Sequence, residues 1–111
     1  MIPSNLTRSG FDVSNPEDEK IDIESLTEIR EFIRTNFEKI KTIVRKDNRT
    51  SHGLVIYLNP CLQRDFENGD FIAAMILEGF KYKQHSINCY FNISQESIKK
   101  LLSMWGETMK Y

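Results

Sequence analysis

The sequence predicts an α+β fold that is mainly helical and carries one small β-hairpin. The order of its elements is compatible with a winged-helix-like domain. Apolar residues recur at spacings of three and four over most of the chain, which is typical of amphipathic helices. Two short stretches on either side of residue 85 alternate instead between polar and apolar residues, as strands do. A chain of 111 residues has room for one domain with one core. We therefore expect an N-terminal tail over residues 1–20 and a single globular domain over 21–111.

The first twenty residues have the composition of a tail. They are rich in Ser, Asn, Pro, Asp and Glu, and their apolar residues are too scattered to form a periodic face. We expect this tail to lie on the domain or on a partner with Phe11 as its anchor, or else to be a loosely held arm.

The first predicted helix covers residues 25–46. Ser25 followed by Glu28 has the spacing of a capping box, in which each side chain bonds an early backbone N–H group. Acidic residues near the start and basic residues near the end both suit the helix dipole. The apolar residues behind the cap form one stripe at spacings of three and four: Leu26, Ile29, Ile33, Phe37, Ile40 and Val44.

Residues 51–66 allow two interpretations. The apolar run at 53–58 has the composition of a buried strand, yet Leu54, Leu58 and Leu62 align on one helical face. We prefer a helix over 51–66 that is kinked near Pro60, because proline removes one backbone donor and clashes one turn back.

The remainder of the chain predicts two helices around a hairpin. Asn-Gly-Asp at 68–70 opens a helix over 69–78 that is apolar on nearly every face and must be buried. Alternating pieces then predict a hairpin over 80–93. Ser94 caps a final amphipathic helix over 95–105.

Four short motifs between residues 51 and 94 carry a resemblance to a known family. They read Ser-His-Gly-Leu at 51–54, Asn-Gly-Asp-Phe-Ile-Ala-Ala at 68–74, Gly-Phe at 79–80 and Asn-Cys-Tyr-Phe-Asn-Ile-Ser at 88–94. This segment resembles a small, largely uncharacterised family of bacterial proteins borne by phages, plasmids and integrative elements. The chain departs from that pattern at His52, Val55 and Ile56, where the relatives have a Tyr and a basic pair. The resemblance implies a mobile-element origin and brings no catalytic residues.

Composition excludes several classes of function. No run approaches the about 18 apolar residues of a membrane span, and no charged leader precedes an apolar run, so we expect a cytoplasmic protein without a membrane partner. Cys61 and Cys89 are then expected to be free thiols. With His52 and His85 they lack the tight spacing of zinc sites. No phosphate loop, nucleophile elbow or carboxylate pair is present, so we expect no catalytic residue, metal or cofactor.

Charge singles out two candidate interaction segments. The formal charge is −1, but residues 1–44 carry six basic and nine acidic residues, and the remainder carries nine and seven. The candidate basic patch comprises Arg45, Lys46, Arg49, Lys81, Tyr82 and Lys83. The candidate acidic segment comprises Asp18, Glu19, Asp22, Glu24, Glu28 and Glu31.

Two functions follow from these features. The preferred one is a non-enzymatic accessory protein that binds and inhibits a host protein or a protein–nucleic acid complex, such as a CRISPR-type defence complex. Its acidic segment would mimic nucleic-acid phosphates, and several aromatic side chains would be available as interface anchors. The alternative is a winged-helix-like DNA- or RNA-binding regulator that uses the basic patch, although the helix in the recognition position has few polar residues. A homodimer is compatible with both.

Overall fold

Four α-helices and two antiparallel hairpins form the fold, in a computed structural model that describes residues 2–13, 20–46 and 49–110. The predicted α+β class is thereby confirmed. In chain order the elements are β1 (Leu6–Thr7), β2 (Gly10–Phe11), the 3-10 helix η1 (Ile23–Leu26), α1 (Thr27–Asn36), α2 (Ser51–Leu62), α3 (Asn68–Leu77), β3 (Tyr82–His85), β4 (Asn88–Phe91) and α4 (Gln95–Thr108).

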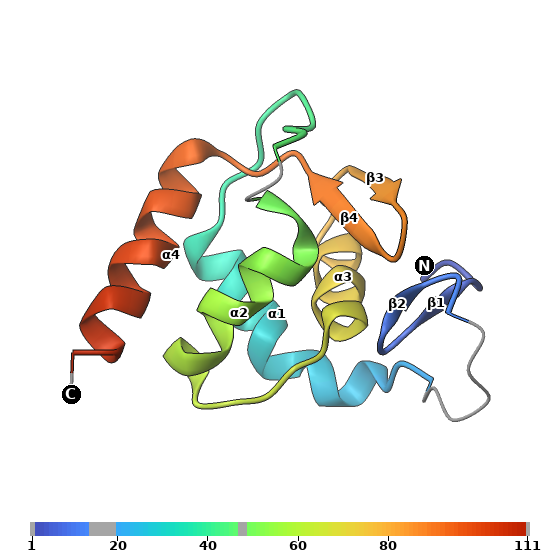
Figure 1. Cartoon of the computed structure of the whole chain (residues 1–111), viewed down its shortest axis with the longest axis horizontal. Helices are drawn as coiled ribbons and strands as arrows, with labels where there is room; N and C mark the ends of the chain where they lie inside the picture. The colour runs from blue at the N-terminus through green and yellow to red at the C-terminus, as the bar shows by residue number, and fades with distance from the viewer. Residues whose placement is uncertain (1, 14–19, 47–48, 111) are drawn as a thin grey trace.

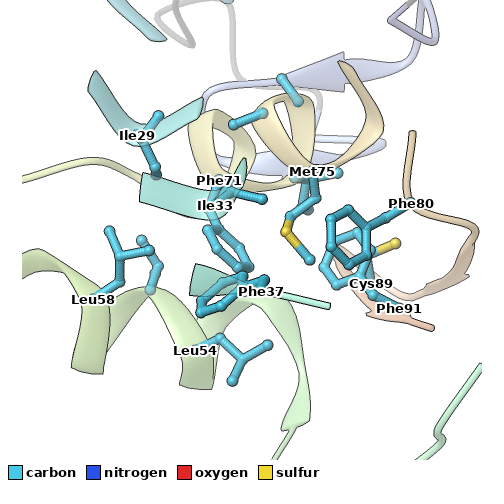
Figure 2. Close-up of a cluster of buried hydrophobic side chains, with 14 of the residues drawn as sticks. Ile29, Ile33, Phe37, Leu54, Leu58, Phe71, Met75, Phe80, Cys89 and Phe91 are labelled. Carbon is cyan, nitrogen blue, oxygen red and sulfur yellow. The ribbon is translucent and has the colours of Figure 1, made fainter. Parts of the chain in front are cut away.

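The central element is α3, which residues of α1, α2, β1, β2 and β4 surround (Figure 1). Its first eight residues are buried, because the sequence offers apolar side chains on almost every face of this helix. Phe71 and Met75 point into a core that also receives side chains from α1, α2 and the β3–β4 hairpin (Figure 2). The prediction of a buried helix at 69–78 is confirmed.

The first predicted helix ends ten residues early. α1 stops at Asn36, and Phe37 takes an extended conformation (φ −108°, ψ 131°). Beyond it the chain runs beside the end of β4 and the residues that follow, where the Ile40 N–H donates to the Asn92 carbonyl at 2.8 Å and the Val44 N–H donates to the Phe91 carbonyl at 3.1 Å. The predicted helix is therefore wrong over 37–46, because backbone groups of this segment bond to residues 91–94 instead of continuing the helix.

The helix also begins differently from the prediction. Asp22, and not Ser25, caps η1 by accepting a hydrogen bond from the Glu24 N–H at 3.2 Å. The Ser25 hydroxyl donates to the Asp22 carbonyl at 2.7 Å, so the expected Ser25–Glu28 capping box does not form.

The helical interpretation of residues 51–66 is confirmed with a shorter length. α2 ends at Leu62 because Gln63 adopts the left-handed conformation (φ 53°), and Pro60 lies in the last turn. The cap is Thr50, whose hydroxyl accepts from the Gly53 N–H at 3.4 Å. Ser51 is buried, and its hydroxyl accepts from the Cys89 N–H at 3.1 Å, which ties α2 to β4.

The C-terminal half follows the prediction closely. β3 and β4 pair antiparallel with Tyr82 opposite Phe91, and Ser86 turns the chain with φ 56°. Ser94 caps α4 by accepting from the Ser97 N–H at 3.1 Å, as expected. α4 continues to Thr108, three residues past its predicted end, and packs on α2.

The described part of the predicted tail lies on the domain. Leu6 and Phe11 are buried in the core, and β1 and β2 form a hairpin that covers one end of α3 (Figure 1). The Gly69 N–H donates to the Arg8 carbonyl at 2.7 Å, and a Cβ at Gly69 would collide with the Thr7 carbonyl. The expected anchor Phe11 is thus buried against this domain.

None of the helices in the described ranges has the length and apolar character needed to cross a membrane.

Candidate functional site: charged surfaces and a groove beside α2

The helix in the recognition position of a winged-helix protein is buried here. The side chain of Asp70 is only 2% exposed and pairs with Arg8. Glu78 at the end of the helix is bonded to two arginines of α1. α3 therefore presents no polar face for base edges or phosphates, and the winged-helix likeness is limited to the order of the elements.

The predicted basic patch divides around β4. Arg45 and Lys46 are exposed next to the segment that pairs with one edge of β4. Tyr82 and Lys83 of β3, and Lys81 directly before it, are exposed at the other edge of β4.

Arg49 differs from the other members of the patch. It is 9% exposed, and its Nε atom is buried without a hydrogen-bond partner in the described part of the chain. Four basic side chains, and not five, therefore reach solvent from the predicted patch.

The described carboxylates of the acidic segment share one face. Asp22, Glu24, Glu28 and Glu31 are all exposed on η1 and α1, and we call these four residues the acidic stripe. Spacings of four and three place the three glutamates on the same side of the helical segment. Glu28 also contacts Arg64 at 3.0 Å. Asp18 and Glu19 lie outside the described residues.

The two arginines of α1 are bonded to Glu78 at the end of α3, and Arg34 also lies near Glu31 of the stripe. Arg30 Nε lies 2.7 Å from Glu78 Oε2, and Arg34 Nε lies 2.9 Å from Glu78 Oε1. The hydrogen bond from Arg34, followed by the weaker effects of Arg30, holds the pKa of Glu78 below its ordinary value. One carboxylate thus engages both positive charges on this flank of the helix.

A groove of about 480 Å³ lies between α2, the loop over 63–67 and the β3–β4 turn. Its apolar lining comes from Val55, Ile56, Phe66 and Ile87, and its polar lining comes from Ser9, His52, Asn59, Asp65, Glu67, Asn68 and Asn88. Ile56 and Ile87 are 52% and 44% exposed, whereas isoleucine is usually buried in a folded protein. This groove could not be predicted from the sequence, because its lining comes from four separate segments.

Asn68 lines the groove and is only partly satisfied. Its Nδ2 group donates to the carbonyls of Ser9 and Ile87 at 3.3 Å each and to Asn88 Oδ1 at 2.9 Å. The residue is 8% exposed, and its Oδ1 atom has no hydrogen-bond partner among the described residues. A buried acceptor without a donor is rare and points to a missing partner.

The aromatic side chains proposed as interface anchors are mostly inside. Phe66, Tyr90 and Phe91 are buried in the core region. Tyr57 and Trp105 pack edge to face at 5.1 Å and are partly covered. Tyr82 remains exposed, and Tyr111 lies outside the described residues. Most of these aromatic side chains therefore pack in or against the core, and Tyr82 is the one in the described ranges that is exposed.

The two cysteines are unpaired thiols in the structure. Burial raises the pKa of the Cys89 thiol to about 12, so it stays protonated at neutral pH. Within the described ranges, no three His, Cys, Asp or Glu side chains gather closely enough to hold a metal ion.

Comparison with known proteins gives no match: no protein-family model, no curated protein and no solved structure matches this chain.

Proposed function

We propose that the chain is a non-enzymatic accessory protein of a phage or other mobile element that acts in the host cytoplasm. It binds and inhibits a host protein, and the partner class we favour is a nucleic-acid-handling defence complex of the CRISPR type. The observation that carries this proposal is the acidic stripe, in which Asp22, Glu24, Glu28 and Glu31 are exposed along η1 and α1.

A row of exposed carboxylates is a surface that a basic protein can recognise. Proteins that handle nucleic acid carry basic channels, and complementary potentials steer such partners together and fix their register. Arg30 and Arg34 of α1 are both bonded to Glu78, although Arg34 also lies near Glu31. Glu28 pairs with Arg64, so Asp22, Glu24 and Glu31 are the carboxylates of the stripe without an ion pair among the described residues. Binding there would compete with nucleic acid for the partner's basic channel.

The alternative function is a DNA- or RNA-binding regulator. It is favoured by the exposed Lys83 of β3 and Lys81 directly before this strand, together with Arg45 and Lys46 beyond the other edge of β4. Four cations would give weak binding that falls steeply with salt. The burial of α3 weighs against this function, because the element that would read base edges is inaccessible.

The two functions are separated by a nucleic-acid binding experiment. Purified protein is mixed with random-sequence single- and double-stranded nucleic acid at low and physiological salt, on a column that also reports mass. We expect no stable complex at physiological salt, and the mass will show whether the protein is a homodimer. Tight binding that is lost in Lys81→Glu/Lys83→Glu and retained in Glu24→Lys/Glu31→Lys would establish the regulator instead.

A further inference from the structure

We propose that the groove beside α2 receives an arginine or lysine side chain of the partner, carried on an apolar segment that covers Ile56 and Ile87. This inference rests on the proposed function, since it names the feature by which the basic partner is recognised. It is carried by the two exposed isoleucines and by the negative charge of the lining.

The charge of the lining selects a cation. Asp65 and Glu67 are its charged members, and no lysine or arginine lines the groove in the described part of the chain. Glu67 also contacts Arg8 at 3.3 Å. Asp65 is exposed and has no ion pair within the described ranges, so its charge remains available to a ligand.

Hydrogen bonds inside the protein hold one wall of the groove in place. The Nδ2 group of Asn68 makes three hydrogen bonds to neighbours that line the groove, so the orientation of this amide is fixed. Its Oδ1 atom is buried, so the acceptors that a guanidinium or ammonium group meets in the groove are the carboxylates of Asp65 and Glu67. Arginine and lysine side chains carry only donors, and their alkyl stems pack on apolar surface.

The apolar rim explains why the cation must sit on an apolar segment. Ile56 on α2 and Ile87 in the β3–β4 turn both line the groove and are about half exposed. A peptide with one basic side chain between apolar neighbours would cover both isoleucines while its charge approaches Asp65. An acidic segment would meet like charge at the same place.

Asp65 links the groove to a second pocket that reaches the start of the acidic stripe. This pocket of about 380 Å³ is lined by Asp22, Asp65 and Asp70 and also by the basic residues Arg8, Lys20 and Arg64. Arg8 pairs with Asp70 and Arg64 pairs with Glu28, so these two positive charges are engaged by carboxylates of the protein. Asp65 is the carboxylate that lines both hollows.

The probe for this inference is the peptide acetyl-Leu-Arg-Leu-amide, compared with the same peptide containing citrulline in place of arginine. Citrulline keeps the shape and removes the charge. Binding is followed by amide resonances of the full chain in two-dimensional NMR. We expect the arginine peptide to shift the resonances of Ser9, Asn68 and Asn88, and the citrulline peptide to bind about tenfold more weakly.

Matched variants locate the site. Asp65→Lys should abolish the shifts, and Glu107→Lys, which reverses an exposed charge on α4, should leave them unchanged. Ile56→Ala/Ile87→Ala should weaken binding, and Leu102→Ala should not. Equal binding of both peptides, full binding to Asp65→Lys, or no binding at all would overturn the inference.

Failure of the groove inference can be distinguished from failure of the proposed function. The peptide experiment uses no host protein, so it can succeed where capture of a partner through the stripe fails. Conversely, a host partner can fail to bind Glu24→Lys/Glu31→Lys and still bind Asp65→Lys fully. That result would support the proposed function and overturn the inference about the groove.

Discussion

Arg8 and Asp70, which are 62 positions apart in the sequence, form a forked ion pair that fastens the N-terminal hairpin to the central helix. Arg8 Nη2 lies 3.1 Å from Asp70 Oδ2, and Arg8 Nε lies 3.2 Å from Asp70 Oδ1. The Asp70 oxygen Oδ2 also accepts from the Glu67 N–H at 2.9 Å, which completes the start of α3. One buried carboxylate therefore serves both the helix cap and the hairpin.

The first prediction concerns this ion pair. Arg8→Ala leaves the Asp70 carboxylate buried without its main counter-charge, which should lower the free energy of unfolding by about 2 kcal/mol. The loss stays below that of a fully buried pair because Arg8 retains contact with water. Urea unfolding followed by circular dichroism measures it. Arg45→Ala at an exposed position is the control, and an equal loss in both variants would refute the role of the pair.

The second prediction compares two glycines in helices. A Cβ at Gly69 would collide with the Thr7 backbone, so Gly69→Ala should displace the N-terminal hairpin and destabilise the protein by about 1–3 kcal/mol. A Cβ at Gly106 would meet nothing within 4 Å, so Gly106→Ala in α4 should stabilise the protein by about 0.5–1 kcal/mol. Thermal unfolding of both variants is the measurement, and opposite signs are expected. Shifts of the same sign would contradict the close approach.

The third prediction concerns the bond between α2 and β4. Ser51→Ala removes the acceptor of the buried Cys89 N–H and should cost about 1–2 kcal/mol. Ser103→Ala on the exposed side of α4 removes a hydroxyl of the same kind and should change stability by less than about 0.5 kcal/mol. Chemical unfolding of the two variants side by side is the test, and a Ser51 variant as stable as the control would show that the bond does not matter.

The fourth prediction concerns the thiols. Cys89 is buried with its pKa raised to about 12, whereas Cys61 is partly exposed. A thiol reagent at pH 8 should therefore modify Cys61 in the native protein and both thiols in urea. Mass spectrometry of the labelled chain gives the sites. Rapid native modification of Cys89 would contradict its burial.

The same shift fixes the sign of a pH dependence. The folded-state pKa of Cys89 lies above the ordinary thiol value of 9.0, so its contribution to stability is complete below about pH 9. Above that pH the unfolded chain releases the proton first, and the contribution is lost as the pH rises toward about 12. Cys89→Ala should flatten this alkaline loss in urea unfolding measured between pH 8 and 10.

Local sequence patterns correctly predicted α3, the β3–β4 hairpin and the start of α4. The uniformly apolar run at 71–77 indicated a central buried helix, and α3 has that place because side chains on all its faces need partners. The hairpin and the cap at Ser94 also followed from local signals, namely alternation and a hydroxyl before an amphipathic run.

The end of α1 could not be predicted from periodicity. Phe37, Ile40 and Val44 continue the helical spacing by coincidence, although the chain is extended there and pairs with β4. The β-branched run Thr42, Ile43 and Val44 was the local signal against a helix. Pairing between segments about fifty residues apart is a tertiary interaction, and it overrode the spacing.

The candidate site was predicted in part. The acidic stripe was visible as a run of carboxylates, and its described members are exposed. The groove was not visible, because Ile56 and Ile87 come together only through the packing of α2 against the hairpin. Asn68 was interpreted as a turn signal, and nothing local indicated that half of its amide would be buried without a donor.

The central claim is that the acidic stripe binds a basic host protein. The most direct measurement is quantitative affinity capture from nuclease-treated bacterial lysate with three baits: the natural sequence, Glu24→Lys/Glu31→Lys and Lys81→Glu/Lys83→Glu. The two variants are matched double charge reversals at exposed positions. We predict that a basic, nucleic-acid-handling protein is captured by the natural sequence and by Lys81→Glu/Lys83→Glu. The same protein should be lost with Glu24→Lys/Glu31→Lys. Capture that depends on Lys81 and Lys83 and is indifferent to Glu24 and Glu31 would contradict the account.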